Sequence, residues 1–283
     1  MFLPRLLFTA MVLCLWTNLG AAQIKAPVPS ADQGSYNPTL TAKEAVLTNW
    51  KLAISGIRAG KFVSDQIVSA KGVNYARLAK QAEFAAKTSL LRYASSYWLF
   101  AMDETTQPIQ RDVIANALRA SRQTCTTSCE TPINTLRSAF ADVSDALDQA
   151  AISAENASAV RQTYSDVQAL AELFLEMAQY LESDAWHTNL SMTRAGLDGQ
   201  EVAARIVGTM AVWRNVEPFV GLRNQEIDDS VNASINRLLR DTRRNTRGKK
   251  VLASDSKEIA IIKKAASQVA SDLRLAAGLF TQG

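Results

Sequence analysis

Apolar residues recur along most of this chain at steps of three and four, which is the spacing of one buried face of an α-helix. The clearest cases are two heptad series, one between residues 133 and 147 and the other between residues 160 and 181. No stretch alternates apolar and polar residues in the way that a half-buried strand does. The pattern therefore predicts an all-α fold with coiled-coil-like seams.

The spacing predicts about eight helices joined by short polar segments. They cover approximately residues 41–60, 62–101, 108–121, 132–152, 160–181, 202–220, 227–242 and 254–280. Short connections favour antiparallel neighbours, so we expect an antiparallel multi-helix bundle. The two heptad helices, joined by about six residues, are expected to form an antiparallel hairpin.

Local signals suggest where these helices begin, bend and end. Thr41 and Glu44 have the spacing of a capping box, which predicts a helix start. Four interruptions are expected to matter: a helix end near Gly60, a bend at Gly72, a break over residues 153–158, and a kink or end at Pro218.

The N-terminus has the layout of a cleavable secretory signal. Arg5 supplies a positive start, residues 6–16 are apolar, and small residues at Gly20 and Ala22 precede an expected cut before Gln23. An apolar run this short is well below the roughly 18 residues that a spanning helix needs. We expect residues 1–22 to be removed, leaving an exported, soluble protein without a transmembrane segment.

The remaining chain is expected to contain one folded domain. Residues 23–40 hold three prolines and little apolar content, which is typical of an extended leader. Residues 41–283 carry all of the helical pattern and contain no further linker, so they are predicted to form a single helical-bundle domain.

Composition and charge exclude some classes of protein. The chain is 47% hydrophobic and 20% charged, as expected for a globular protein. The formal net charge is +4 and falls to +3 once Arg5 is removed with the signal. A surplus this small does not favour a nucleic-acid partner.

The cysteines suggest one disulfide. Cys14 lies in the signal, so only Cys125 and Cys129 are expected in the exported protein. In an oxidising compartment, a pair separated by three residues predicts a local bridge. Closing so short a loop contributes about 2 kcal/mol, so the fold should not depend on it.

Residues suited to catalysis are scarce. His187 is the only histidine, and the Asp184 and His187 pair lacks the additional ligands of a metal site. We therefore expect no enzymatic activity, metal or cofactor. Glu217 is the one acid in a mostly apolar stretch and lies next to Arg214, so we expect it to be buried and paired with an arginine.

Two residue sets are candidates for binding. An aromatic set could line a small-molecule pocket between helices and comprises Tyr93, Tyr97, Trp98 and Phe100. A dense basic run could meet anionic lipid, polysaccharide or an acidic partner and comprises Arg237, Arg240, Arg243, Arg244, Arg247, Lys249 and Lys250.

These patterns predict a non-catalytic, exported interaction or scaffold component of a bacterial cell envelope, periplasmic or secreted. The heptad seams would offer helical faces for self-association or for an envelope protein partner. The alternative prediction is a periplasmic helical bundle that binds or senses a small molecule through the aromatic set.

Overall fold

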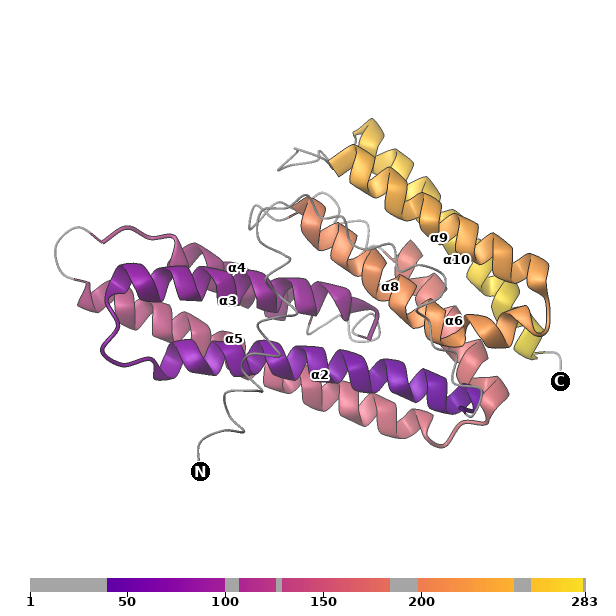
Figure 1. The fold of residues 1–283 in the computed structure, drawn as a ribbon, viewed down its shortest axis with the longest axis horizontal. Helices are drawn as coiled ribbons and strands as arrows, with labels where there is room; N and C mark the ends of the chain where they lie inside the picture. Colours follow the sequence, from indigo (N-terminus) through magenta and orange to yellow (C-terminus); the bar gives the residue numbers. More distant parts are fainter. Residues whose placement is uncertain (1–39, 100–106, 126–128, 184–197, 247–255, 282–283) are drawn as a thin grey trace, which may run out of the picture. The chain divides into compact units, whose positions relative to one another are not determined.

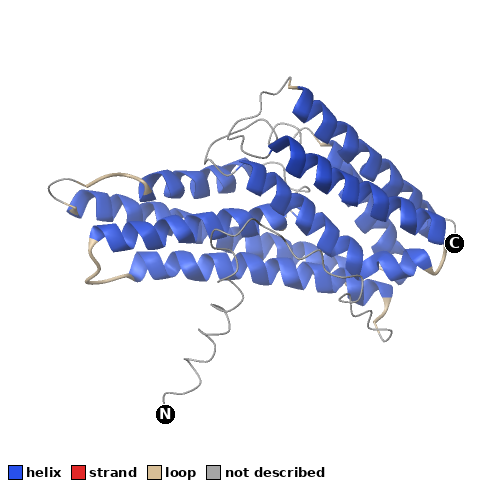
Figure 2. Cartoon of the chain, turned by 45° about the horizontal axis from the view of Figure 1, so that its top comes forward, coloured by secondary structure: helices blue, strands red, loops and turns tan. Residues whose placement is uncertain are grey.

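The computed structural model describes residues 40–99, 107–125, 129–183, 198–246 and 256–281. These residues form eight α-helices and one short 3-10 helix, and no strand occurs among them (Figure 2). The predicted all-α, multi-helix bundle is therefore confirmed.

The described helices follow one another along the chain. Their bounds are α2 (Ala42–Ser69), α3 (Tyr75–Ser95), the 3-10 helix η3 (Tyr97–Leu99), α4 (Gln107–Ser121), α5 (Glu130–Arg161), α6 (Asp166–Glu182), α8 (Asp198–Gly221), α9 (Gln225–Thr246) and α10 (Lys257–Thr281). All of them belong to one compact unit, residues 38–283.

The helices α2, α3, α4 and α5 pack around a common core, with α2 against α3 and α5, and α4 against α3 and α5 (Figure 1). The long helices α2 and α5 are antiparallel, because Arg58 pairs with Glu155 while Asp65, further along α2, accepts a hydrogen bond from Ser144. Small residues allow close packing here: a Cβ on Gly60 would lie 3.3 Å from a Leu147 methyl group.

The remaining helices form a second group in which α10 packs against α6 and α9, and α8 packs against α9. Its core contains Phe174, whose ring centroid lies 5.7 Å from that of Trp213 and 6.0 Å from that of Phe280. Arg223, just before α9, donates to the carbonyl of Leu279 near the end of α10 (2.6 Å). The helices α9 and α10 are therefore antiparallel.

The two groups meet where α8 crosses α3 and where α2 packs against α6 and α8. At the first crossing the backbones nearly touch: a Cβ built on Gly208 would overlap the Ser95 carbonyl oxygen and lie 2.7 Å from its carbon. At the second, Asn49 of α2 donates to the carbonyl of Val212 (3.2 Å) and accepts a hydrogen bond from Asn215. The lack of a side chain at Gly208 and the hydrogen-bonded amides of Asn49 and Asn215 thus position α8.

The heptad seams are used inside the bundle. On α5 the side chains of Leu136, Phe140, Val143 and Leu147 are at most 1% exposed. The α10 seam is equally buried, from Ile259 to Phe280. These faces pack against other helices of the same chain.

Several predicted boundaries were wrong. The first helix continues past Gly60 to Ser69, since this glycine packs between α3 and α5 rather than ending the helix. The interruption lies instead at Gly72, where φ is +66°, a backbone conformation that glycine adopts without strain. The predicted bent second helix is therefore two helices, α2 and α3.

The remaining predictions concern residues 153–158, where the structure differs, and Pro218, which does not end its helix at once and whose predicted kink stays a prediction. No break occurs at 153–158, because α5 stays helical to Arg161 and buries Ala154 and Ser158. The hairpin turn follows over residues 162–165, and Val160, expected in a seam, is 54% exposed. The helix α8 continues through Pro218 for three more residues to Gly221.

Two further predictions concern the helix cap at Thr41 and the absence of a transmembrane helix. The predicted capping box is present: the Thr41 hydroxyl accepts from the Glu44 backbone N–H (3.2 Å) and Glu44 accepts from the Thr41 N–H (2.7 Å). No helix of the described residues combines the length and the apolar character needed to cross a membrane. The predicted signal and nearly all of the predicted leader lie outside the described residues.

Candidate functional site

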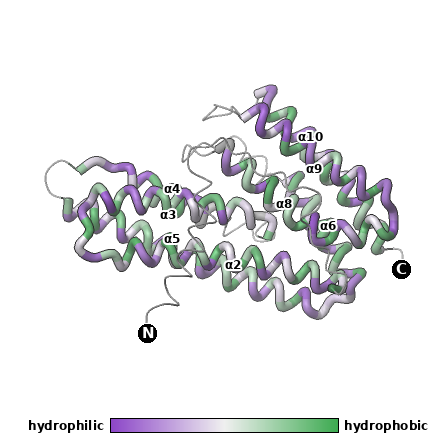
Figure 3. Tube along the Cα trace, in the orientation of Figure 1, coloured by the Kyte–Doolittle hydropathy of each residue, from purple (hydrophilic) through white to green (hydrophobic). Residues whose placement is uncertain are grey.

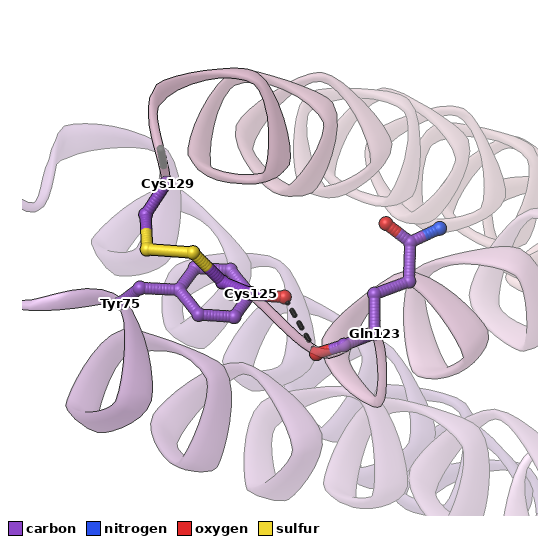
Figure 4. The surroundings of a disulfide bond; sticks show 4 residues. All are labelled: Tyr75, Gln123, Cys125 and Cys129. Carbon is purple, nitrogen blue, oxygen red and sulfur yellow. Dashed lines mark hydrogen bonds between the residues drawn. A yellow bond between two sulfur atoms is a disulfide. The ribbon is translucent and has the colours of Figure 1, made fainter. Parts of the chain in front are cut away.

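The disulfide predicted between α4 and α5 is present. Cys125 and Cys129 are bridged, with their Cα atoms 5.7 Å apart (Figure 4). Beside it, the Tyr75 hydroxyl at the start of α3 donates to the backbone carbonyl of Gln123 (2.9 Å). The bridge and this hydrogen bond both hold the end of α4, which is a structural role.

The aromatic set contributes to the core where its side chains are described. Tyr93 on α3 is fully buried, and Trp98 in η3 is 5% exposed. The Trp98 ring meets the Trp50 ring nearly edge to face, with centroids 5.5 Å apart. The side chain of Tyr97 and all of Phe100 lie outside the described part of the structure, so a pocket at this set stays a prediction.

The basic run lies partly on α9. Arg237, Arg240, Arg243 and Arg244 occupy its last three turns, and Arg247, Lys249 and Lys250 lie outside the described residues. The side chain of Arg237 is 64% exposed, Arg240 and Arg244 are exposed, and Arg243 is half-buried. The described arginines of the run therefore remain accessible to a partner.

The start of α10 adds cations to the same region. Because α9 and α10 are antiparallel, the end of α9 lies beside the start of α10 (Figure 1). We call these two segments, residues 237–246 and 257–264, the basic end. Its cations are Arg237, Arg240, Arg243, Arg244, Lys257, Lys263 and Lys264. Its acids are Asp241 and Glu258, so positive charge is in clear excess.

Three arginines of the basic end have no recorded ion pair with another described residue. Arg237 is 3.5 Å from Asp241, one turn away on the same helix. For Arg240, Arg243 and Arg244 the structure records no carboxylate or carbonyl acceptor among the described residues. Most other described arginines do have such an acceptor, for example Arg58, Arg122 and Arg274.

Two buried ion-pair clusters join helices that are distant in sequence. Glu201 at the start of α8 binds both Arg111 of α4 (3.0 Å) and Arg205 one turn along α8, and all three side chains are at most 8% exposed. Burial raises the pKa of Glu201, but the two guanidinium groups overcome this effect and hold it below its usual value. This cluster ties α4 to α8.

The second cluster is centred on Arg161 at the end of α5. Its guanidinium pairs with Glu176 of α6 and lies over the Trp50 ring, 4.2 Å from the centroid. Burial raises the pKa of Glu176 despite the charge of Arg161. The sequence pattern contained no signal for the pairing of Arg111 with Glu201 or of Arg161 with Glu176, because these residues become neighbours only when helices pack.

Neither His187 nor Asp184 lies in the described residues. Within the ranges that the structure describes, no group of three or more His, Cys, Asp and Glu side chains is arranged to hold a metal ion.

The expected pairing of Glu217 with an arginine is wrong. Glu217 is half-buried and accepts a hydrogen bond from Asn232 of α9 (2.8 Å). The same Asn232 amide donates to Asp228 (3.0 Å), and its carbonyl accepts from the Trp213 indole N–H (2.9 Å). One amide thus bridges two carboxylates, and no cation neutralises them within the described residues.

This arrangement alters the acidity of Asp228. Burial, followed by the charges of Glu217 and Asp229, raises the pKa of Asp228 to about 6. Hydrogen bonds from Gln225 and Asn232 oppose the shift but do not reverse it. Because the folded-state pKa is above the unfolded value of 3.8, folding favours the protonated acid. The ionised form consequently weakens the fold as the pH rises through about 6.

We therefore expect Asp228→Asn to stabilise the protein at pH 8. The substitution removes the buried charge but also one hydrogen-bond acceptor, so the net gain is about 1–2 kcal/mol. Below about pH 3 the gain should disappear, since Asp228 is then mostly protonated in both the folded and the unfolded state. Urea unfolding across this pH range measures the effect, with Asp229→Asn as the exposed neighbour that should change stability much less. Equal stability of Asp228→Asn and the parent at pH 8 would contradict the prediction.

No protein-family model, curated protein or solved structure matches this chain.

Proposed function

We propose that this protein is an exported, non-catalytic interaction component of a bacterial cell envelope that attaches to an anionic surface through its basic end. The secretory layout of the N-terminus and the single local disulfide support export. The observation that carries the proposal is the unpaired state of Arg240, Arg243 and Arg244.

Three arginines of the basic end differ from several other arginines of the described chain, which bind carboxylates. Elsewhere in the described chain, arginines serve the fold: Arg111, Arg161 and Arg205 bind buried carboxylates. The basic end instead gathers cations with few acids near them, in a chain whose formal charge is only +4. Like charges held together without partners repel one another, so their concentration favours a role in binding over a role in stability.

A simpler reason for cations at this place is the helix dipole, which favours them at a helix C-terminus. That effect fades beyond the last turn, which contains Arg243 and Arg244. Arg240 and Arg237 lie further from the end of α9, and Lys257 lies at the start of α10, where the dipole disfavours a cation. The dipole therefore accounts for only part of the basic end.

The partner surface is then the outside of α9 and α10 rather than a heptad seam. In Figure 3 the hydrophilic residues are prominent along these two helices. The large apolar side chains that are exposed, such as Leu52, Phe62 and Leu275, are spread over different helices, as is usual for a protein surface. Electrostatic attraction is accordingly the main force that we propose for docking.

A small-molecule-binding or sensing role remains the alternative that the sequence predicts. It is supported less well, because Tyr93 and Trp98 of the predicted pocket pack in the hydrophobic core.

The proposed attachment is tested with the folded chain lacking residues 1–22. Each basic residue near an anionic membrane contributes about 1 kcal/mol, so Arg240→Gln, Arg243→Gln and Arg244→Gln together should weaken vesicle binding roughly 100-fold at low salt. The measurement is co-sedimentation with vesicles of phosphatidylcholine and phosphatidylglycerol. Binding should fall at high salt, since exposed charges are screened beyond about 8 Å at physiological ionic strength.

A matched control removes the same charge from elsewhere. Lys51, Arg77 and Lys80 are exposed on α2 and α3, and no ion pair is recorded for them among the described residues. Changing all three to Gln should leave vesicle binding nearly unchanged. Equal loss in both triple variants would mean that only net charge matters, and equal binding by all three proteins would overturn the proposed function.

A further inference from the structure

We infer that the basic end recognises lipid phosphate groups through arginine side chains, and not simply any negative charge. This inference rests on the proposed attachment and specifies its ligand. The four cations on α9 are all arginines, and the helix contains no lysine.

Arginine and lysine differ in what they bind well. A guanidinium group presents five N–H donors in a planar fork, which matches two oxygens of one phosphate, whereas an ammonium acts as a strongly hydrated point charge. Arg240, Arg243 and Arg244 have no acceptor for these donors among the residues that the structure describes. Their donors remain available for phosphate oxygens.

The arginines are also arranged in a row. Residues separated by three, four or seven positions share one side of a helix, so Arg237, Arg240 and Arg244 lie along the same side of α9. With a rise of about 1.5 Å per residue, this row is about 10 Å long. Arg243 lies at its edge and is half-buried. The row can therefore contact more than one phosphate at a time.

One carboxylate lies within the row, and it has a partner. Asp241 is half-buried and pairs with Arg237, and no ion pair between a described carboxylate and the other three guanidinium groups is recorded. The Asn245 amide and the Thr246 hydroxyl donate to carbonyls of α9 itself, and no hydrogen bond from these arginines to either side chain is recorded. Among the described residues, the outer side of the row is therefore uncovered.

Among phosphate-bearing partners, a lipid surface fits best. An exported protein meets phosphate chiefly on membrane headgroups. A nucleic-acid site of this kind would carry aromatic side chains between its cations, and residues 237–246 contain none. A membrane presents many phosphates in one plane, which suits a straight row of forks on a helix.

The test keeps the charge and changes only the side-chain geometry. In the variant Arg240→Lys, Arg243→Lys and Arg244→Lys, the helix propensity is nearly unchanged, so α9 should remain folded. Binding is measured to phosphatidylcholine vesicles that contain either phosphatidylglycerol or oleate at equal surface charge, and vesicles of phosphatidylcholine alone give the background. Circular dichroism checks the fold of each variant.

We expect the lysine variant to bind phosphatidylglycerol vesicles about tenfold more weakly than the parent, because each fork is replaced by a single point contact. On oleate vesicles the lysine variant should also bind more weakly than the parent, because a guanidinium fork matches the two oxygens of a carboxylate as well. The parent should also prefer phosphatidylglycerol to oleate.

Two results would overturn the inference. Equal binding of the parent and the lysine variant to phosphatidylglycerol vesicles would mean that charge alone is recognised. A preference of the parent for oleate would point to a carboxylate-bearing partner, such as an acidic protein. In either case the glutamine variant still tests the proposed function separately: if it binds weakly, attachment through the basic end stands, and if it binds as the parent does, both conclusions fall.

Discussion

Replacing Gly208 by alanine is expected to destabilise the protein by about 3 kcal/mol or more, because overpacking against backbone cannot be relieved by a rotamer change. A Cβ at this position would overlap the carbonyl oxygen of Ser95 and lie 3.1 Å from its Cα. Both atoms belong to the end of α3, so α8 or α3 must move as a unit. Thermal unfolding followed by circular dichroism should show a midpoint lower by roughly 6–12 °C.

A second glycine in a helix provides the control. A Cβ on Gly278 of α10 would meet no atom within 4 Å. Gly278→Ala should therefore stabilise the protein by about 0.4–1 kcal/mol, since alanine restricts the unfolded chain and favours helix. A Gly208→Ala protein as stable as the parent would show that α3 and α8 do not approach so closely.

Changing Glu201 to glutamine is expected to cost about 3–5 kcal/mol, the second large effect. The substitution keeps the size of the side chain but removes the negative charge between Arg111 and Arg205. Since the pKa of Glu201 is lowered in the folded state, its contribution is present above the unfolded value of 4.5 and is lost as the pH falls through the folded value. Urea unfolding at pH 7 measures the cost.

An exposed pair supplies the comparison for Glu201. Arg58 and Glu155 also form an ion pair between two helices, but their side chains are 59% and 40% exposed. Glu155→Gln should therefore cost at most about 1 kcal/mol. If the Glu201 and Glu155 variants lose equal stability, the buried cluster does not contribute as its burial implies.

The correct predictions concern features formed by residues close together in sequence, whereas the wrong ones concern positions where packing between helices decides the structure. The capping box at Thr41 was predictable, because its two hydrogen bonds involve residues three positions apart. The start of α4 near residue 108 was predictable for a similar reason, since a proline is tolerated in the first turn of a helix, where no helical N–H partner exists. The Cys125–Cys129 bridge also closes within five residues.

The wrong boundaries share a tertiary cause. Gly60 usually weakens a helix, yet α2 continues through it because the close packing of Ser89 and Leu147 requires a residue without a side chain. Residues 153–158 are rich in polar and small side chains, but packing of Ala154 and Ser158 in the core keeps them helical. Burial of neighbouring residues outweighed the local preference in both places.

For the candidate site, the sequence located the cations but could not show whether they were free. The density of arginine in residues 237–244 was visible directly. The sequence could not reveal that Arg237 pairs with Asp241, whereas no ion pair of Arg240, Arg243 or Arg244 is recorded among the described residues. It also could not reveal that the start of α10, with Lys257 and Lys264, packs beside the end of α9. For Glu217 the sequence suggested a partner that the structure does not confirm. Arg214 is near it in sequence, but Glu217 accepts its hydrogen bond from Asn232.

By itself, the sequence determined the all-α class, the number of helices among the described residues, most buried faces and the local disulfide, because each depends on residues within a few turns of one another. Only the tertiary structure decided which helices pack together and where α3 and α8 touch. It also decided which charges are buried in pairs and which remain open at the basic end. The physical reason is that these features depend on distances between residues far apart in the chain, such as Arg111 and Glu201, which no local pattern records.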